Sequence, residues 1–318
     1  MMTSMHNPQK YVIVGLSGGV DSAVCCRLLQ RNGYTVTGLF LVMSDVHHES
    51  LPSAQKTAGE LGIELITRDV SKEFYEEIIQ YFMHAYADGI TPNPCVYCNE
   101  RVKFKKLLEI ADEYEYPYIS TGHYAKLSVI DGTYILSRAD EIKKDQSYML
   151  YRLDQDVLSR LILPLGSYTK SSIRSIAEEE GLSAFNAPDS QEICFIRDES
   201  YTEYMHRNNI KGLSGNFILP TGEILGVHKG TEYYTVGQRK GLNVCLGTPV
   251  YIKKILTSGD ILLDTSSGIQ ISGIVAEDLF INPHFNIDES SEYSCKVRYS
   301  NNSSSVSVKK TETGYISL

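Results

Sequence analysis

The chain has 318 residues, 42% of them hydrophobic, and a formal net charge of −9 at pH 7. This length accommodates two or three domains, and no run approaches the roughly 20 apolar residues of a membrane span. The negative charge argues against nucleic-acid binding by the whole surface, but it is compatible with a local basic track. Seven cysteines, an odd number in a chain of this length, argue against a disulfide framework.

From residue 11 to about residue 125, apolar strand-like runs alternate with helical patterns. Strands are predicted at 11–16, 36–42, 64–70 and 118–121. Helices are predicted at 22–32, 52–61, 72–86 and 100–114. This alternation is typical of βαβ units, so the predicted fold class is α/β with a doubly wound parallel sheet. Ligands are then expected at the carboxyl ends of the strands.

The pattern changes along the second half of the chain. Residues 155–181 again predict helix, whereas after about residue 201 Gly-rich turns separate short predicted strands at 216–219, 233–236, 250–255, 261–263, 271–275, 294–299 and 306–309. We therefore expect an α/β catalytic domain over 1–200, a small central linking domain over 201–249 and a β-barrel-like domain over 250–318.

The most informative motif is Leu-Ser-Gly-Gly-Val-Asp-Ser at 16–22, between the first strand and the first helix. Unpaired N–H groups and the helix dipole make such a helix start an anion cradle, and glycine lets the backbone approach the ligand. The motif has neither the Lys of GxxxxGK[ST] nor the spacing of GxGxxG. It matches SGGxDS, the pyrophosphate (PP) loop of ATP pyrophosphatases that adenylate a substrate. The alternative is a chance Gly-rich turn.

A second motif is the pair Cys95 and Cys98, directly before the predicted helix 100–114. A helix N-terminus stabilises a thiolate, which makes such a thiol a nucleophile or a metal ligand. Arg101 and Lys103 should act in the same direction.

A third thiol, Cys194, lies far along the chain in Ile-Cys-Phe-Ile. Two other interpretations of the thiols remain open: apolar packing at a helix start, or a zinc site, although Cys194 lacks the second CxxC partner that a four-thiolate site needs. The other cysteines are predicted to be structural: Cys25, Cys26, Cys245 and Cys295.

Nine short strings together resemble one family. They are SGGVDS at 17–22, TPNPxxxCN at 91–99, Lys-Phe at 103–104, TGHYA at 121–125, KDQSY at 144–148, LPLG at 163–166, ICFI at 193–196, YYTVGQRKGL at 233–242 and VRY at 297–299. In this order they resemble the bacterial tRNA-specific 2-thiouridylases, PP-loop enzymes that replace the 2-oxygen of the wobble uridine with sulfur.

The resemblance implies an adenine-nucleotide α-hydrolase type of sheet that binds ATP and Mg²⁺. Asp21 is suited to a Mg²⁺-bound pyrophosphate because hard cations prefer carboxylate oxygens. Leu41 matches the position that packs on adenine, and Gly122 a position where a side chain would obstruct the nucleotide. The implied ATP-binding residues are Gly15, Leu16, Ser17, Gly18, Gly19, Val20, Asp21, Ser22, Leu41 and Gly122.

The resemblance also implies tRNA as the substrate partner, bound through its anticodon stem-loop. Arg and Lys supply phosphate affinity, and Tyr can stack on an unpaired base, so the wobble base is expected to be flipped out. The implied contact residues are Asn93, Pro94, Cys95, His123, Lys144, Asp145, Gln146, Arg298 and Tyr299.

For the sulfur step, the resemblance implies a persulfide on Cys194, with Cys98 as its resolving partner or as the nucleophile in sulfur release. The sulfur donor would be a cysteine desulfurase or relay protein. Cys95 departs from the pattern, because the family commonly has Asp at this position as a general acid/base. A second hypothesis therefore makes Cys95, Cys98 and Cys194 the metal ligands of a [4Fe-4S] cluster, whose open iron would take free sulfide.

A second departure is that the chain ends at Leu318, where the family continues through further strands, so a shortened C-terminal barrel is expected. An alternative function is that of a PP-loop enzyme or amidotransferase acting on a small molecule. A noncatalytic RNA-binding or zinc-ribbon protein is another, but it leaves the loop unexplained. The polar residues 1–10 lack a signal region or an Arg/Ser-rich leader, which predicts a cytoplasmic protein without membrane association.

Overall fold

The computed structural model describes residues 10–187, 193–265, 273–299, 303–312 and 314–317. Its contacts divide the chain into two compact units. The first unit comprises residues 1–78, 95–197 and 282–285, and the second comprises 79–94, 198–281 and 286–318. The predicted three-domain boundaries remain a prediction.

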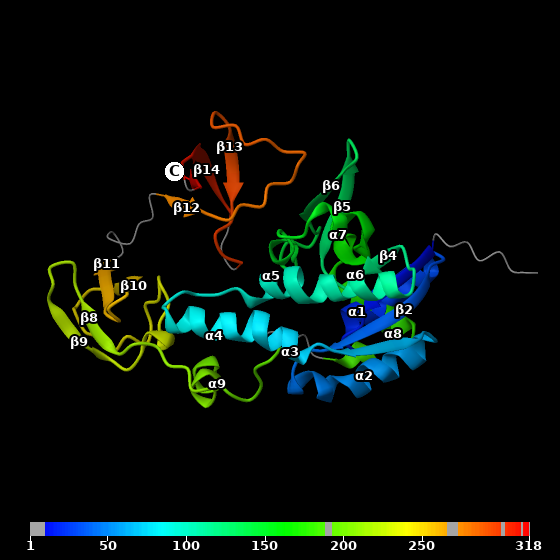
Figure 1. The fold of residues 1–318 in the computed structure, drawn as a ribbon, viewed down its shortest axis with the longest axis horizontal. Coiled ribbons are helices and arrows are strands. Elements are labelled where there is room, and N and C mark those ends of the chain that lie inside the picture. Colours follow the sequence, from blue (N-terminus) through cyan, green and yellow to red (C-terminus); the bar gives the residue numbers. More distant parts are fainter. Residues whose placement is uncertain (1–9, 188–192, 266–272, 300–302, 313, 318) are drawn as a thin grey trace, which may run out of the picture. The chain divides into compact units, whose positions relative to one another are not determined.

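A parallel sheet of strand order β3-β2-β1-β4-β7 forms the centre of the first unit (Figure 1). Its strands are β1 (Tyr11–Gly15), β2 (Thr35–Val42), β3 (Leu65–Asp69), β4 (Tyr118–Ser120) and β7 (Leu161–Ile162). The predicted doubly wound sheet is confirmed. Because the strand order reverses between β1 and β4, the carboxyl end of β1 is the switch point at which such sheets bind ligands.

The core of this unit follows from the apolar run of β1. Val12 and Val14 are fully buried in one cluster with residues of α1 (Val20–Arg31), α2 (Asp45–Leu61) and α8 (Lys170–Glu179). Strand alternation turns Ile13, also fully buried, to the opposite face. Cys25 and Cys26 belong to the core, as predicted.

Several helices differ from their predicted bounds. The predicted helix 100–114 already begins as α5 (Pro94–Cys98), and it continues through a π-helical turn (Asn99–Lys103) into α6 (Phe104–Glu113). Proline at the first helical position loses no hydrogen bond, so Pro94 can start the helix. The predicted helix 72–86 consists of α3 (Ser71–Phe74), a π-helical turn (Tyr75–Ile79) and α4 (Gln80–Ala87).

The prediction of continuous helix over 155–181 is wrong. Helix α7 (Gln155–Arg160) is followed by β7, which pairs with β4, and by a 3₁₀ turn (Pro164–Ser167) before α8. Sheet pairing therefore overrides the local helical pattern. The sequence analysis also missed the hairpin of β5 (Ala125–Ile130) and β6 (Thr133–Arg138), whose turn residues Asp131 and Gly132 have φ of +50° and +78°.

The second unit contains α9 (Tyr201–Arg207) and two small sheets. One sheet has the order β10-β11-β8-β9, and its apolar core includes Phe217, Ile252 and Leu263. The other has the order β12-β15-β14-β13. Their strands are β8 (Gly215–Ile218), β9 (Ile224–His228), β10 (Val250–Ile255), β11 (Ile261–Thr265), β12 (Ile274–Ala276), β13 (Glu292–Cys295), β14 (Ser304–Lys310) and β15 (Tyr315–Ser317).

The predicted strand 233–236 is wrong. A 3₁₀ turn (Thr231–Tyr233) ends where this strand was expected to begin, and residues 234–236 form no strand. The turn is stabilised by the buried carboxylate of Glu232, which is held by His206 Nε2 at 2.8 Å and by the N–H of Gly212 at 3.1 Å. Part of the predicted strand 271–275 lies outside the described residues. In place of the predicted strand 294–299, the structure has β13, which begins and ends earlier in the chain.

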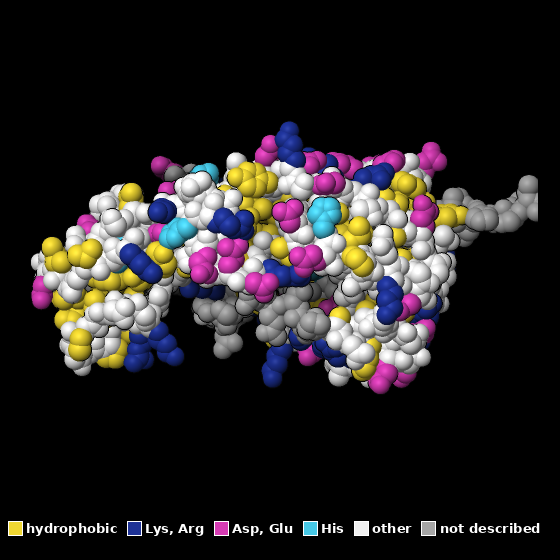
Figure 2. Space-filling model, turned by 90° about the horizontal axis from the view of Figure 1, so that it is seen from below, with side chains coloured by type: hydrophobic (Ala, Val, Ile, Leu, Met, Phe, Trp, Pro, Cys, Tyr) yellow, Lys and Arg dark blue, Asp and Glu magenta, His cyan; other side chains and the backbone are white. Residues whose placement is uncertain are grey.

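Charged side chains of both signs are interspersed on the face drawn in Figure 2. Within the described part of the chain, no helix is both long enough and apolar enough to span a bilayer.

Candidate active site

The candidate PP loop connects β1 to α1 at the switch point. Gly18 has a φ of +82°, and a Cβ there would lie 2.8 Å from the backbone N of Ala54, so only glycine fits. Ser22 Oγ donates to Gly19 O at 3.0 Å and accepts from the N–H of Ser17 at 3.2 Å. Gly19, the N-cap of α1, supplies no capping side chain. The first turn of α1 can therefore present its N–H groups to an anion.

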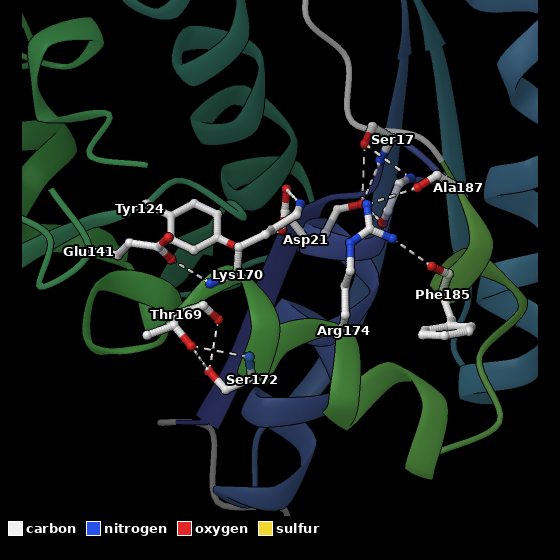
Figure 3. Close-up of polar contacts among 12 residues, drawn as sticks. Ser17, Asp21, Tyr124, Glu141, Thr169, Lys170, Ser172, Arg174, Phe185 and Ala187 are labelled. Atoms are coloured by element: carbon white, nitrogen blue, oxygen red, sulfur yellow. Dashed lines mark hydrogen bonds and ion pairs between the residues drawn. The ribbon is translucent and has the colours of Figure 1, made fainter. Parts of the chain in front are cut away.

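Asp21 is the charged residue of the loop, and its carboxylate is held from two sides (Figure 3). Lys170 Nζ donates to both of its oxygens, at 2.7 and 2.8 Å, and the hydroxyl of Tyr124 donates to Oδ1 at 2.6 Å. The Lys170 side chain is only 12% exposed. The arrangement places one cation and one carboxylate beside the anion cradle, the pair of charges that a metal-bound polyphosphate requires.

Sequence reasoning missed Lys170. It is the first residue of α8, its backbone N–H donates to Glu141 Oε2 at 2.6 Å, and Thr169 caps the helix (Figure 3). No motif spacing relates Lys170 to the loop, because 149 residues separate it from Asp21. A lysine directly after a capping Thr is a common helix start, so the sequence offered no specific signal.

Gly122 follows β4 and faces the PP loop itself. A Cβ at this position would lie 2.9 Å from the backbone carbon of Asp21 and 3.0 Å from the N of Ser22. The side chain would thus displace the loop backbone, which differs from the expected obstruction of the nucleotide. Leu41, near the carboxyl end of β2, is buried at 8% exposure, and its packing against adenine stays a prediction.

We expect Gly122→Ala to weaken ATP binding and to lower the free energy of unfolding by about 1–3 kcal/mol, the usual cost of overpacking. Gly59→Ala in α2 is the matched control, because a Cβ there meets nothing within 4 Å. It should leave ATP binding unchanged. Denaturant unfolding and calorimetric ATP titration measure both effects; equal behaviour of the two variants would refute the close approach.

The two thiols of the CxxC motif differ in depth. Cys95 is exposed, whereas Cys98 is buried at 6% exposure. Burial raises the pKa of the Cys98 thiol, and the nearby Lys103 only partly offsets this effect. The expected stabilisation of a Cys98 thiolate by the helix start is therefore wrong in this structure, because the helix begins at Pro94 and desolvation outweighs the positive charge.

Cys194 lies in the neighbourhood of the other two thiols. Cys194 is exposed, and desolvation by the protein around it raises the pKa of its thiol to about 12; the neighbouring Cys98 and Cys95 add to the rise. Lys103 opposes the shift. The three thiols come from two distant segments, and each of Cys98 and Cys194 interacts electrostatically with Cys95 and with Lys103. Their joint role in the reaction stays a prediction.

Lys103 also influences two histidines. Burial and then the charge of Lys103 lower the pKa of His123 to about 3 and that of His47 to about 4. His123 is held by Thr121 Oγ1 at 2.8 Å and stacks on Phe104 with ring centroids 6.0 Å apart. Both histidines are consequently neutral at pH 7, so Lys103 is the cation common to the thiols and the imidazoles.

The predicted tRNA-contacting loop 144–146 is organised by its own side chains. The buried Asp145 carboxylate accepts from the N–H of Ala139 at 3.0 Å and from Ser147 Oγ at 2.9 Å. Gln146 Oε1 accepts from the N–H of Tyr124 at 2.9 Å. In this structure Asp145 and Gln146 therefore shape the loop, and Lys144 is half-buried at the start of it.

The remaining predicted tRNA contacts are distributed between the units. Pro94 and Asn93 belong to the second unit, at the start of α5. Arg298 donates to the carbonyl of Val236 at 2.9 Å, and Tyr299, 42% exposed, lies under the ammonium of Lys296 at 5.1 Å.

The fit of metals to these residues differs between the two candidate sites. The Asp21 carboxylate is a suitable donor for Mg²⁺, within reach of the PP-loop N–H groups. Over the residues that the structure describes, by contrast, no group of three Cys, His, Asp or Glu side chains is placed to hold one metal ion. The buried Cys98 and the exposed Cys95 and Cys194 do not form an assembled cluster site as they stand.

Comparisons with known proteins show the family of the chain. Residues 10–198 match the family model described as tRNA methyl transferase HUP domain, and residues 204–263 match tRNA methyl transferase PRC-barrel domain. The chain is 36% identical over 315 residues to tRNA-specific 2-thiouridylase MnmA 2 of Clostridium botulinum, covering 96% of this chain and 89% of that one. It is 38% identical over 308 residues to tRNA-specific 2-thiouridylase MnmA of Clostridium beijerinckii, covering 92% and 86%.

Among solved structures, the chain is similar to the U34-tRNA thiolase NcsA from Methanococcus maripaludis with its [4Fe-4S] cluster, at a TM-score of 0.40 and 19% identity, covering 62% of this chain and 66% of that one. A likeness this distant carries no argument about the reaction.

The parallel sheet and the PP loop at its switch point define a nucleotide-binding protein of the HUP class, followed by a PRC-barrel domain. Within that class, the chain belongs to the MnmA family of tRNA-specific 2-thiouridylases.

Proposed function

We propose that the chain is an ATP-dependent tRNA uridine 2-sulfurtransferase that adenylates the 2-oxygen of a wobble uridine and replaces it with sulfur. One observation carries the proposal: a single compact unit contains both a PP loop and the thiols of Cys98 and Cys194. An activating nucleotide and a sulfur carrier are the two components that this reaction needs. Relatives named as tRNA-specific 2-thiouridylases support the assignment.

In the first step, the 2-oxygen of the uridine attacks the α-phosphorus of ATP, and pyrophosphate leaves. The N–H groups at the start of α1 and the Lys170 ammonium bind the charge that collects on the pyrophosphate. Asp21 would hold Mg²⁺, which supplies further charge neutralisation when bound. Lys170, which pairs with Asp21 in this structure, would supply a positive charge for the phosphates beside that carboxylate.

In the second step, the terminal sulfur of a Cys194 persulfide attacks C2 of the adenylated base, and AMP leaves with the original oxygen. The Cys98 thiolate then attacks the Cys194 sulfur, which yields 2-thiouridine and a Cys98–Cys194 disulfide. An external thiol must return two electrons to restore both cysteines. Because the pKa of Cys98 is raised, its attack requires loss of a proton, and the Lys103 ammonium favours the resulting thiolate.

The persulfide would come from a cysteine desulfurase or a relay protein. The described thiols are not placed as a three-ligand set, which favours the persulfide over an iron–sulfur cluster. Cys95, beside the two reacting thiols, then occupies the position that meets the target base, together with Asn93 and Pro94. Contacts of Lys144, Arg298 and Tyr299 with the tRNA belong to the same proposal.

The proposal is tested by AMP formation that depends on tRNA, followed by thiolation with either a persulfide donor or free sulfide. We expect tRNA-dependent AMP and thiolation from the persulfide by anaerobically purified protein without iron. Stoichiometric iron in the protein, together with thiolation of tRNA from free sulfide alone, would refute the persulfide route and support the cluster route. AMP formation without tRNA would indicate a small-molecule substrate, and methylation of tRNA would contradict sulfur transfer.

A further inference from the structure

An aromatic and cationic cluster borders the thiols and has no part in the chemistry above. Tyr97 lies between Cys95 and Cys98 in α5, with the guanidinium carbons of Arg101 and Arg152 over its ring, 4.8 and 5.8 Å from the centroid. All of these residues belong to the first unit.

The cluster extends to two further tyrosines on the 3₁₀ turn Ser147–Met149 and just beyond it. Tyr148 and Tyr151 have ring centroids 6.3 Å apart at an interplanar angle of 56°. Tyr151 is 50% exposed, and its electrostatic partners include Arg152 and Tyr97. We call these five residues the Tyr–Arg surface: Tyr97, Arg101, Tyr148, Tyr151 and Arg152.

The two segments that carry the surface are fixed to each other. The buried Asn99 donates from Nδ2 to the carbonyl of Met149 at 2.9 Å, and Glu100 forms an ion pair with Arg152 at 2.9 Å. Arg101 is restrained by Glu77 at 3.3 Å. These contacts fasten the segment of Tyr148, Tyr151 and Arg152 to the helical segment that carries Cys95, Tyr97 and Cys98.

The composition of the surface favours one kind of occupant. Half-exposed tyrosines and guanidinium planes provide flat π faces on which unpaired nucleobases stack, whereas a folded protein partner is usually met by a larger apolar patch. The carboxylates of Glu77 and Glu100 offset part of the arginine charge, so affinity here should depend on stacking more than on phosphate attraction.

We infer that the Tyr–Arg surface stacks an unpaired RNA base next to the target uridine, and that it thereby holds the loop open while the uridine reaches the thiols. The inference rests on the proposed function, since it takes the substrate to be a single-stranded tRNA loop. Tyr151 is the exposed tyrosine of this surface, whereas Tyr97 and Tyr148 are half-buried. It is a positioning residue rather than one that touches the reacting atoms.

The test uses the full-length protein and an anticodon stem-loop RNA that carries 2-aminopurine beside the wobble uridine. Binding to wild type should quench the 2-aminopurine fluorescence through stacking. Tyr151→Ala should lose the quenching and weaken RNA binding about tenfold, while Tyr151→Phe, which keeps the ring, should restore both. The control Tyr75→Ala removes a ring of similar exposure, 40%, in the same unit and should change neither.

AMP formation separates this inference from the proposed function. For Tyr151→Ala we expect the KM for RNA to rise about tenfold with kcat at saturating RNA nearly unchanged, and ATP affinity to be unaltered. If wild type is active and Tyr151→Ala shows the same quenching and the same RNA affinity, the stacking surface is overturned and the proposed function stands. If Tyr151→Ala impaired only the transfer of the persulfide to the protein, the surface would bind a donor protein, and RNA stacking would again be overturned.

Discussion

Cys194→Ser is expected to abolish tRNA thiolation while tRNA-dependent AMP formation persists. Serine cannot carry a persulfide, so no sulfur reaches the activated base, whereas the PP loop and Asp21 are unaffected. The loss should exceed about 10³-fold, since the nucleophile itself is removed. Mass spectrometry of nucleosides from the treated tRNA measures thiolation, and chromatography of the nucleotides measures AMP.

Cys245→Ser provides the matched control, because Cys245 is also exposed but lies in the second unit. It should retain full activity. Thiolation by Cys194→Ser at the wild-type rate would remove this residue from the mechanism. A further variant, Cys95→Ala, separates the two sulfur routes: near-normal activity supports the persulfide route, and loss of activity together with iron supports the cluster.

Lys170→Met is expected to lower the rate of AMP formation by about 10²–10³-fold, the typical effect of removing one preorganised donor from a site of developing charge. The defect should lie in adenylation, which precedes sulfur transfer, so the rate of thiolation should fall in proportion to the rate of AMP formation. Asp21→Asn should cause a comparable loss, which raised Mg²⁺ concentration should relieve only weakly. Pyrophosphate release in the presence of saturating tRNA and ATP measures both variants.

Lys126→Met is the control for this prediction, since Lys126 forms an exposed ion pair with Asp140 in the same unit. Exposed pairs contribute little, so its activity and stability should stay near those of wild type. Full AMP formation by Lys170→Met would show that the ion pair with Asp21 is structural only. Thermal unfolding of the variant distinguishes a catalytic defect from loss of the fold.

Sequence patterns predicted the strand, loop and helix that form the PP loop because their determinants are local. The apolar run of β1, the two glycines and the start of α1 are contiguous, so spacing alone places the loop at the end of a buried strand. Gly18 illustrates this: its positive φ and close approach to α2 require the residue type that the motif contains. The parallel sheet follows from the same alternation of strands and helices.

Local patterns were misleading where distant pairing decided the structure. The stretch 155–181 has helical spacing, but β7 interrupts it because Leu161 and Ile162 complete the sheet beside β4. The stretch 233–236 has strand spacing, but it forms no strand: it follows a 3₁₀ turn that ends at Tyr233 and that the buried Glu232 and its partner His206 stabilise. Both errors reflect contacts with residues far along the chain, which no window of local sequence contains.

The sequence by itself determined the fold class and the PP loop, since both depend on residue types at short spacing. It also supplied the charged side chains and the cysteines of the candidate site. Only the tertiary structure decided their chemical state. It placed Lys170 on Asp21 across 149 residues, buried Cys98 so that desolvation raises its pKa, and brought Cys194 beside it. Protonation and ion pairing depend on burial and on charges nearby in space, and both are set when the chain packs.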